Sequence, residues 1–463
     1  MLSVLYIALA TAMFFLQDTY FLIGEVAFSL KNPCAVAILF LALLHVITTA
    51  RLGRLIVLAR HTAVQIFPFV IPFLFSAVLW VISGADSITI ANGVGMILPQ
   101  LLSVCVAAAT LHLFGGRGIW YCLGSMCAAN FLRVIIVILE GGLDEFLREF
   151  GALLLSFSAE NGPLMLQLEI NDLTFAFGPL LLYLLLNRKE VSHFLFWFVI
   201  TALLFLIGLK RIAVAALILG TAMALLLRKL PEKAARQTAL CAAIGMMAVS
   251  FLYIAGIRSG LFLYLEKRLQ INTMGRVEMF TNLEPYYDIS FTYLGKGTGF
   301  ERFVDWASGK VYDVPQRTIM QIHNDFLRMY LNIGFIGYWV WLWSFFIVRL
   351  RYWFRQGGKR SGCLFFGICV YCFVLYATDN TVYYPYTLIA CSLVPMSYQF
   401  DRLSDEEPGP YRIGEEASGR SERLSSALLS VPEFPPKRGI FQVVGAMQCV
   451  DYAWRCGYDT SCC

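Results

Sequence analysis

His323 is the side chain of this sequence best placed to take up and release a proton. It stands in the run Gln-Ile-His-Asn-Asp-Phe-Leu at 321–327, at the end of a polar stretch, residues 257–328, that lies between apolar segments. Imidazole has the unperturbed pKa nearest to physiological pH, which suits a general base. We therefore predict that His323 is a catalytic base. Asn324 and Asp325 either support it or cap the helix that follows, because both residue types are good N-caps.

Cations stand at two places where they could bind an anion. Lys210 and Arg211 form an adjacent pair in a tight turn between two apolar segments. Arg276 follows Gly275, and a guanidinium presents a rigid fork of donors that fits phosphate oxygens. We predict that these three cations bind a diphosphate. The alternatives are that Lys210 and Arg211 reach the phosphates of membrane lipids and that Arg276 is a solvated surface residue.

Composition places these residues in a membrane protein. Of the 463 residues, 59% are hydrophobic and 14% are charged, whereas soluble domains carry roughly 25% charged residues. Apolar stretches of about 17–25 residues can cross a bilayer as helices. The sequence therefore predicts an all-α polytopic membrane protein with about twelve transmembrane helices. The expected spans are residues 2–24, 33–50, 64–83, 93–114, 118–139, 171–186, 192–208, 211–228, 236–256, 329–349, 361–378 and 382–400.

Basic residues gather in alternate connections between these spans. Cytoplasmic loops carry the excess of Lys and Arg, so the alternation sets the orientation. We predict that both chain ends are cytoplasmic, and that loops 140–170 and 257–328 and the Lys210–Arg211 turn are extracytoplasmic. The net charge is only +5, with its cations at span ends, so we expect no nucleic-acid partner. The basic connections are residues 51–60, 117, 187–189, 228–236 and 349–360.

The expected spans divide the chain into four regions. Residues 1–256 hold the first nine spans and the outer loop 140–170, residues 257–328 form a large extracytoplasmic loop that we expect to cover the active site, and residues 329–400 hold the last three spans. Residues 401–463 begin rich in Ser, Glu, Arg, Pro and Gly, which predicts a largely disordered cytoplasmic tail. The 13 cysteines avoid both outer loops, so no disulfide framework is expected there.

The glycine-rich run at 295–299, Gly-Lys-Gly-Thr-Gly, is similar to a phosphate-binding loop in composition alone. It lacks the spacing of a P-loop and the Lys-Ser/Thr pair that completes one. The pattern predicts a turn.

Several short motifs lie between residues 165 and 345. In chain order they are Asn171 at the opening of the sixth span, the basic turn at Arg211, Gly275-Arg276, the glycine run 295–299, and His323-Asn324-Asp325. Their order and sidedness resemble the O-antigen polymerase and ligase superfamily, whose members are bacterial membrane glycosyltransferases with Gly-Arg, Gly-x-Gly and His-Asn motifs in the loop before a late span. The His-Asn-Asp form is more similar to polymerases than to ligases.

The resemblance implies a donor, a glycan linked to polyprenyl diphosphate, at the outer face of the bacterial inner membrane. It implies that Lys210, Arg211 and Arg276 hold the diphosphate, that His323 deprotonates an acceptor hydroxyl, and that Asn171 supports the site. The reaction would invert the anomeric carbon and need neither metal nor cofactor. The partners implied are the lipid bilayer, the glycan acceptor, a chain-length regulator and a flippase. Tyr286, Tyr287, Tyr293 and Trp306 would either stack on sugars or pack within the loop.

Other functions stay open at this point. A ligase would use the same residues but transfer the glycan to lipid A core or another acceptor. A flippase or other transporter of lipid-linked oligosaccharide is typified by charges at mid-membrane and by short outer loops. The spans here are nearly free of charge except at their ends, and one outer loop is long. A structural or signalling membrane protein would leave the outer cations unexplained. We therefore favour polymerisation of surface polysaccharide.

Overall fold

The computed structural model describes residues 1–17, 19–23, 26–49, 52–156, 170–208, 210–270, 276–300 and 322–405. These residues lie within one compact unit, Met1–Glu406. The expectations for Gly275, for Trp306 and for the tail beyond Asp405 with its cysteines fall outside the described residues.

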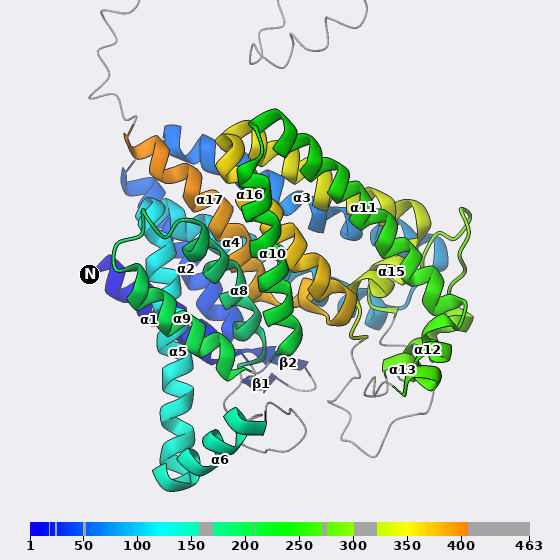
Figure 1. Ribbon diagram of the computed structural model, residues 1–463, viewed down its shortest axis with the longest axis horizontal. Coiled ribbons are helices and arrows are strands. Elements are labelled where there is room, and N and C mark those ends of the chain that lie inside the picture. Colours follow the sequence, from blue (N-terminus) through cyan, green and yellow to red (C-terminus); the bar gives the residue numbers. More distant parts are fainter. Residues whose placement is uncertain are drawn as a thin grey trace, which may run out of the picture. The chain divides into compact units, whose positions relative to one another are not determined.

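Helices make up nearly all of the described chain (Figure 1). The helices of the first half are α1 (Leu2–Phe15), α2 (Lys31–Thr49), α3 (Leu52–Ser83), α4 (Ser87–Phe114), η1 (Gly115–Arg117), α5 (Gly118–Gly141), α6 (Leu143–Ser156), α8 (Asn171–Leu186), α9 (Phe194–Ile207) and α10 (Arg211–Lys229). Those of the second half are α11 (Glu232–Arg258), α12 (Leu261–Leu269), α13 (Arg276–Leu283), η2 (Glu284–Tyr286), α15 (Asp325–Leu342), the π-helix η3 (Trp343–Val348), α16 (Arg349–Thr378), η4 (Thr381–Tyr383) and α17 (Pro385–Asp405).

Each apolar stretch that we expected to span a membrane contains a helix over at least part of its length. Among the described residues, six segments are long and apolar enough to cross a membrane, judged by length and composition. Two of the six hold more than one helix: Thr89–Gly141 contains α4 and α5, which meet at Gly115 with φ +61°, and Asp325–Thr378 contains α15, η3 and α16. The other four are Lys31–Thr49, Leu55–Ser83, Arg211–Lys229 and Glu232–Arg258.

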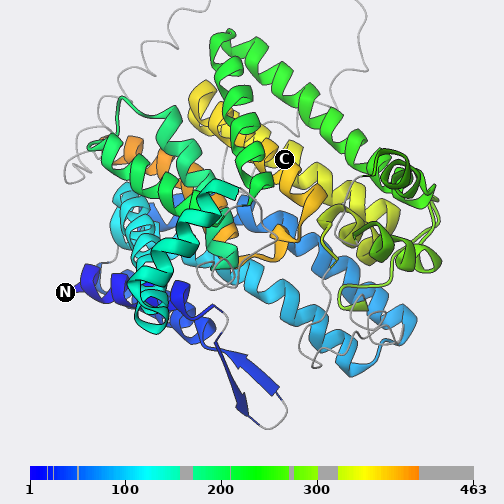
Figure 2. The ribbon, with the colours of Figure 1, turned by 60° about the horizontal axis from the view of Figure 1, so that its bottom comes forward.

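The expected first span, residues 2–24, is wrong in its second half. Helix α1 ends at Phe15, and residues Tyr20–Ile23 form strand β1, which pairs antiparallel with β2 (Val26–Ser29). Gln17 and Thr19 interrupt the apolar run, and the aromatic and branched residues that follow favour strand. Figure 2 shows this hairpin projecting from the neighbouring helices.

Both segments that we expected to form long outer loops contain helices. Helix α6 lies within 140–170, and α12, α13 and η2 lie within 257–328. The polar composition of these regions predicted loops because it lacks long apolar runs. Short helices with one apolar face need no such run, and the amphipathic pattern of Leu261–Leu269 is the sequence signal of α12.

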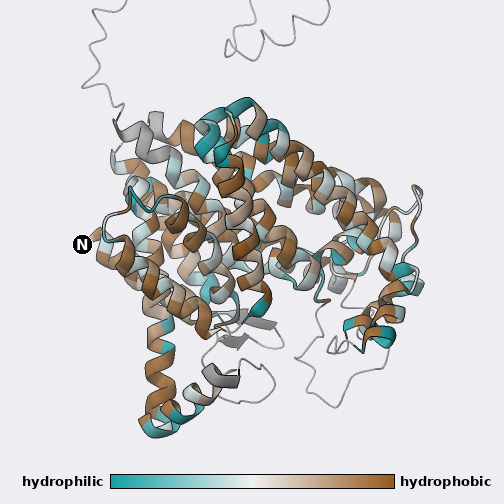
Figure 3. Cartoon of the chain, in the orientation of Figure 1, coloured by the Kyte–Doolittle hydropathy of each residue, from teal (hydrophilic) through white to brown (hydrophobic). Residues whose placement is uncertain are grey.

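The core is formed by the helices of the last third of the chain and their neighbours. Helix α17 packs against α4 and α8, and α16 packs against α10 and α11 (Figure 1). Residues along α8, α15, α16 and α17 are almost completely buried. Outer helices instead expose large apolar side chains, such as Phe40, Val81 and Leu252, and hydrophobic residues cover much of the helical surface in Figure 3. Exposed apolar surface on this scale indicates a membrane protein.

Three of the basic connections meet at one end of the helices. The guanidinium of Arg228 donates to the carbonyl oxygen of Leu186, and Arg360 pairs with Glu190 and lies 3.5 Å from Oδ1 of Asn187. Figure 3 shows hydrophilic residues gathered where α10 turns into α11 beside α16. Residues 187–189, 228–236 and 349–360 therefore share one end of the helical body.

Candidate functional site

His323 lies directly before α15 and is held by the connection between α16 and α17. Its Nδ1 is 3.1 Å from Oδ1 of Asp379, the first residue after α16. The His323 side chain is 39% exposed and that of Asp379 is 10% exposed. Oδ1 of Asp379 also accepts the N–H of Asn380 at 2.9 Å and the hydroxyl of Tyr384 at 3.3 Å. Several hydrogen bonds thus hold the carboxylate of Asp379 in place, while part of the imidazole ring of His323 stays exposed.

Asn324 and Asp325 have structural roles. Oδ1 of Asn324 accepts the N–H of Leu327 at 3.0 Å, which is the N-cap bond that opens α15. Asp325 is fully buried; its Oδ2 accepts the N–H of Val382 at 2.8 Å, and its own N–H donates to the carbonyl oxygen of Asp379 at 3.2 Å. The cap prediction for Asn324 is confirmed, and Asp325 ties the start of α15 to the α16–α17 connection.

Opposing effects set the pKa of Asp379. Burial alone raises the pKa of this carboxyl group. The hydrogen bonds from His323 and from the Asn380 N–H, together with the charges of His323 and Lys210, outweigh burial and hold the pKa below its usual value. Asp379 is therefore a carboxylate at neutral pH, and it presents negative charge to His323.

The predicted cations lie at different distances from this pair. Lys210 is half-buried at the start of α10, and its charge acts on Asp379. Arg211 is exposed, and within the described ranges no contact joins it to His323 or Asp379. Of the two cations predicted from this turn, Lys210 thus lies near enough to Asp379 for its charge to act there, whereas Arg211 is exposed at the start of α10.

Arg276 approaches the same connection from another direction. It is the half-buried first residue of α13, and its charge acts on the hydroxyl of Tyr253. That hydroxyl donates to the carbonyl oxygen of Ala377 at 3.0 Å, two residues before Asp379. Arg276 therefore lies near enough for its charge to act on a side chain that is hydrogen-bonded to the end of α16.

Asn171 opens α8 as predicted, but its side chain is outside the described part of the chain. Its neighbour Asp172 is the residue that sequence reasoning missed. Fully buried, Asp172 accepts the N–H groups of Tyr386 at 2.7 Å and Thr387 at 3.0 Å, and the Thr387 hydroxyl at 2.9 Å. It thereby accepts hydrogen bonds from N–H groups in the first turn of α17 that have no partner within the helix. An acidic residue at the opening of an apolar stretch was the available signal.

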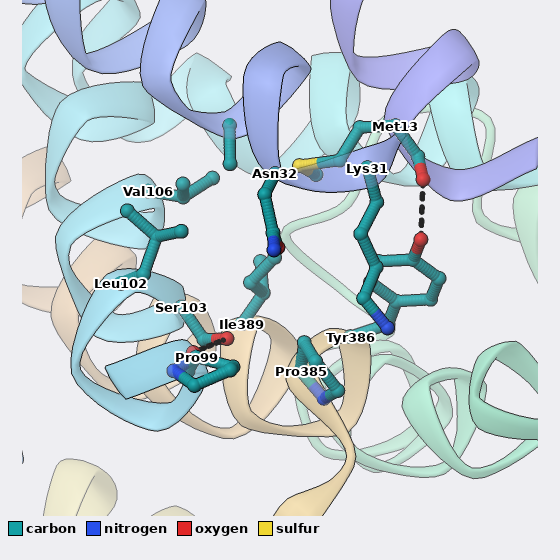
Figure 4. Close-up of a pocket in the computed structure, with 11 residues that line it drawn as sticks. Met13, Lys31, Asn32, Pro99, Leu102, Ser103, Val106, Pro385, Tyr386 and Ile389 are labelled. Atoms are coloured by element: carbon teal, nitrogen blue, oxygen red, sulfur yellow. Dashed lines mark hydrogen bonds between the residues drawn. The ribbon is translucent and has the colours of Figure 1, made fainter. Parts of the chain in front are cut away.

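A small pocket lies beside the start of α17, between α1, α2, α4 and α17 (Figure 4). Lys31, Asn32 and Ser103 contribute its polar groups, and Pro385 and Tyr386 contribute the start of α17. The Tyr386 hydroxyl donates to the carbonyl oxygen of Met13. The lining is mostly apolar, and the pocket adds no acid or base to the His323–Asp379 pair.

The glycine run, taken with its two neighbours as residues 294–300, is a turn that joins helices and is buried at Gly297, Thr298 and Gly299. The Gly297 N–H donates to the carbonyl oxygen of Asn332 at 2.8 Å, and the Thr298 hydroxyl lies 2.9 Å from that of Ser76. The Trp80 indole donates to the carbonyl oxygen of Thr298 at 3.2 Å. This run therefore pins α15 to α3, as expected for a turn. Tyr293 also packs inside the protein, stacked on Tyr330 with ring centroids 5.4 Å apart.

Among the described residues, no group of three or more His, Cys, Asp or Glu side chains is arranged to hold a metal ion. No family model and no curated protein matches this chain.

Proposed function

We propose that this protein transfers a glycan from polyprenyl diphosphate to an acceptor sugar and so polymerises the repeat units of a bacterial surface polysaccharide. The proposed site consists of His323 as base, Asp379 as the residue that positions it, and Lys210, Arg211 and Arg276 as the cations that receive the diphosphate. The observation that carries this proposal is the His323–Asp379 pair at 3.1 Å, with the histidine partly exposed and Lys210 acting on the carboxylate.

The proposed orientation rests on the basic connections that meet at one end of the helical body. Connections 187–189, 228–236 and 349–360 meet at one end through Arg228 and Arg360, which supports a common cytoplasmic side. In an alternating chain of twelve spans, His323 and Lys210 then lie at the extracytoplasmic face of the inner membrane, and both termini are cytoplasmic. A polyprenyl-linked donor in the outer leaflet would meet the site there.

His323 fits the role of a general base. In the proposed pairing, the Nδ1–H of His323 donates a hydrogen bond to the carboxylate of Asp379, which leaves the lone pair of Nε2 for an incoming hydroxyl. Such an arrangement, in which a buried carboxylate orients the histidine, fixes the tautomer and stabilises the imidazolium that forms. Asn324 and Asp325 contribute by holding the chain on which His323 stands.

The proposed reaction balances without a further reagent. The acceptor hydroxyl gives its proton to Nε2 of His323 as its oxygen forms a bond to the anomeric carbon. The bond from that carbon to the diphosphate oxygen breaks, and its electron pair leaves on the diphosphate. Lys210, Arg211 and Arg276 stabilise the charge that develops there. Attack from the side opposite the leaving group inverts the anomeric carbon.

Variants of His323 test this proposal in proteoliposomes with lipid-linked repeat units. His323→Ala and His323→Gln should insert and fold normally but lower the transfer rate by about 10²–10⁴-fold, because glutamine retains a hydrogen-bonding group and takes up no proton near neutral pH. The matched control is His193→Gln, an exposed histidine before α9, which should retain the wild-type rate. A normal rate for His323→Gln would show that another group is the base.

Lipid-linked glycans from a strain that lacks the protein separate polymerase from ligase. A polymerase defect leaves single repeat units on the carrier, whereas a ligase defect leaves long chains on it. Long carrier-linked chains would show that the protein is not the polymerase; the proposal of glycosyl transfer at the same site would then stand with a ligase reaction.

A further inference from the structure

Helix α12 turns an apolar face away from the protein. Leu261, Tyr264 and Leu269 are 48%, 63% and 61% exposed, and at 100° per residue they fall on one side of the helix together with Leu265. Arg268 lies within this stripe, and Lys267 lies at its edge; both are exposed. A side with apolar residues and basic heads is typical of helices that lie in a membrane interface.

The other side of α12 is held by α11. The ring of Phe262 packs edge-on against that of Tyr253, with centroids 4.8 Å apart. A Cβ at Gly256 would lie 2.9 Å from the Phe262 ring, so the glycine permits this close approach. Gly260, at φ +71°, makes the sharp turn between the two helices. The direction in which the stripe faces is therefore fixed by packing.

The place of α12 in the chain identifies what the stripe meets. Helix α11 forms one of the candidate membrane spans, and it ends at Arg258, three residues before Leu261. A helix of nine residues is about 13 Å long, so every residue of α12 stays within about that distance of the level at which α11 ends. The bilayer surface is therefore within reach of the stripe of Leu261, Tyr264 and Leu269.

We propose that α12 docks on the bilayer surface, with Leu261, Tyr264 and Leu269 at the boundary between acyl chains and headgroups and with Lys267 and Arg268 against the phosphates of anionic lipids. This inference goes beyond the proposed function, because it concerns the partner of a surface distinct from His323 and holds whatever reaction the protein catalyses. Docking anchors the start of the outer region that carries Arg276.

Helix α6 is the natural comparison. It also follows a candidate span and has an apolar stripe, but Phe146 and Phe150 of that stripe pack beside Val137 of α5. Its exposed polar side carries Asp144 and Glu145, with Arg148 3.6 Å from Glu145. An acidic helix gains nothing from anionic lipid, so only α12 should respond to lipid charge.

The test uses the full-length protein, one copy per lipid nanodisc, with a genetically encoded fluorescent amino acid in place of Tyr264. Lipids brominated near the headgroup should quench this probe several-fold more strongly than a probe in place of Asp144 on α6. Quenching at position 264 should increase as phosphatidylglycerol replaces phosphatidylcholine. The double variant Lys267→Gln/Arg268→Gln changes two exposed residues and should keep the fold while losing that dependence on anionic lipid.

Equal quenching at positions 264 and 144 in both lipids would overturn the proposal. A probe at 264 that lipid does not quench, in a protein that forms dimers once extracted, would assign the face to a second copy of the chain and would also overturn it. Neither result bears on glycan transfer, which is measured separately with the His323 variants.

Discussion

The glycine run 294–300 and the His323–Asp379 pair are both polar breaks among apolar helices, yet their surroundings differ. In the glycine run, Thr298 is completely buried and its N–H, hydroxyl and carbonyl groups are all hydrogen-bonded to α3. At the pair, Asp379 is nearly buried and its Oδ1 accepts three hydrogen bonds, whereas the His323 side chain is 39% exposed and, among the described residues, is bonded through Nδ1 alone. One region is closed and the other retains an open edge.

The difference separates a structural polar segment from a chemical one. Buried polar groups in apolar surroundings must be paired, so a polar run inside a membrane protein is expected to complete its own bonds. A site must instead leave one reactive group unpaired and accessible to substrate. By this criterion His323 and its neighbours are a candidate site, whereas the glycine run is a joint between α15 and α3.

The largest expected effect is on folding, from Gly334→Ala. Gly334 sits at the break in α15, with φ +67° and ψ −171°, a region almost restricted to glycine. A Cβ there would lie 2.2 Å from the carbonyl carbon of Leu294, within the glycine run. Strain and overlap together should cost about 3–5 kcal/mol of folding stability. We expect little folded protein in the membrane, measured by size-exclusion chromatography and thermal unfolding.

Gly358→Ala is the matched control, because Gly358 breaks α16 with φ +62° and ψ −159° in open space. Its Cβ would meet only Oε1 of Glu232, at 3.7 Å. This variant should lose folding stability through backbone strain alone, by about 1–3 kcal/mol. Equal losses for both variants would mean that the glycine run exerts no packing constraint on α15.

The next effect is on catalysis, from Arg276→Lys. A lysine retains the charge but loses the forked contact with phosphate, so the rate should decrease by about 10²–10³-fold if Arg276 stabilises the leaving diphosphate. Arg258→Lys serves as the control, since Arg258 is the last residue of α11 and its bridge to Glu284, at 3.8 Å, is partly exposed. Full activity of Arg276→Lys, measured in proteoliposomes, would remove Arg276 from the site.

Much of the fold could be predicted because a helix in a membrane needs only a long apolar run. The sequence located the helices through such runs, as for α10 and α11, whereas the start of α16 lies in residues 349–360, which were predicted as a basic connection. It marks α12 only through the amphipathic pattern of Leu261–Leu269, and it does not reveal the β1–β2 hairpin. The hairpin is short, and its strands lie inside a stretch that reads as the end of an apolar span.

The site could be predicted only in part, for a related reason. His323 and Lys210 stand out by residue type and position. Asp379 lies 56 residues after His323 and meets it only because the end of α16 packs beside the start of α15. Asp172 is bonded to α17 across 214 residues. Such contacts depend on packing, which no local pattern encodes.

A smaller effect is expected from Asp379→Asn, which probes the positioning of His323. Loss of one charge-assisted hydrogen bond costs about 1.5–3 kcal/mol, so the rate should decrease by about 10–10²-fold. The decrease should appear in kcat, with little change in KM for the lipid-linked donor, because Asp379 acts through His323. Asp288→Asn, an exposed loop residue, is the control. An unchanged kcat would mean that contacts other than the one with Asp379 orient the His323 ring.

The smallest effect concerns acid, and it tests whether Asp379 is charged in the folded protein. Its pKa is lower when folded than the unfolded value of 3.8, so as pH falls the unfolded chain binds the proton first. The contribution of the carboxylate to stability is therefore complete above the unfolded pKa and is lost as pH falls through the folded one. Thermal unfolding in detergent between about pH 5 and pH 3 should show the advantage of wild type over Asp379→Asn shrinking by a few degrees. An advantage that stays constant or grows on acidification would mean that the pair with His323 contributes no charge interaction, and that Asp379 holds the connection only as a hydrogen-bond acceptor.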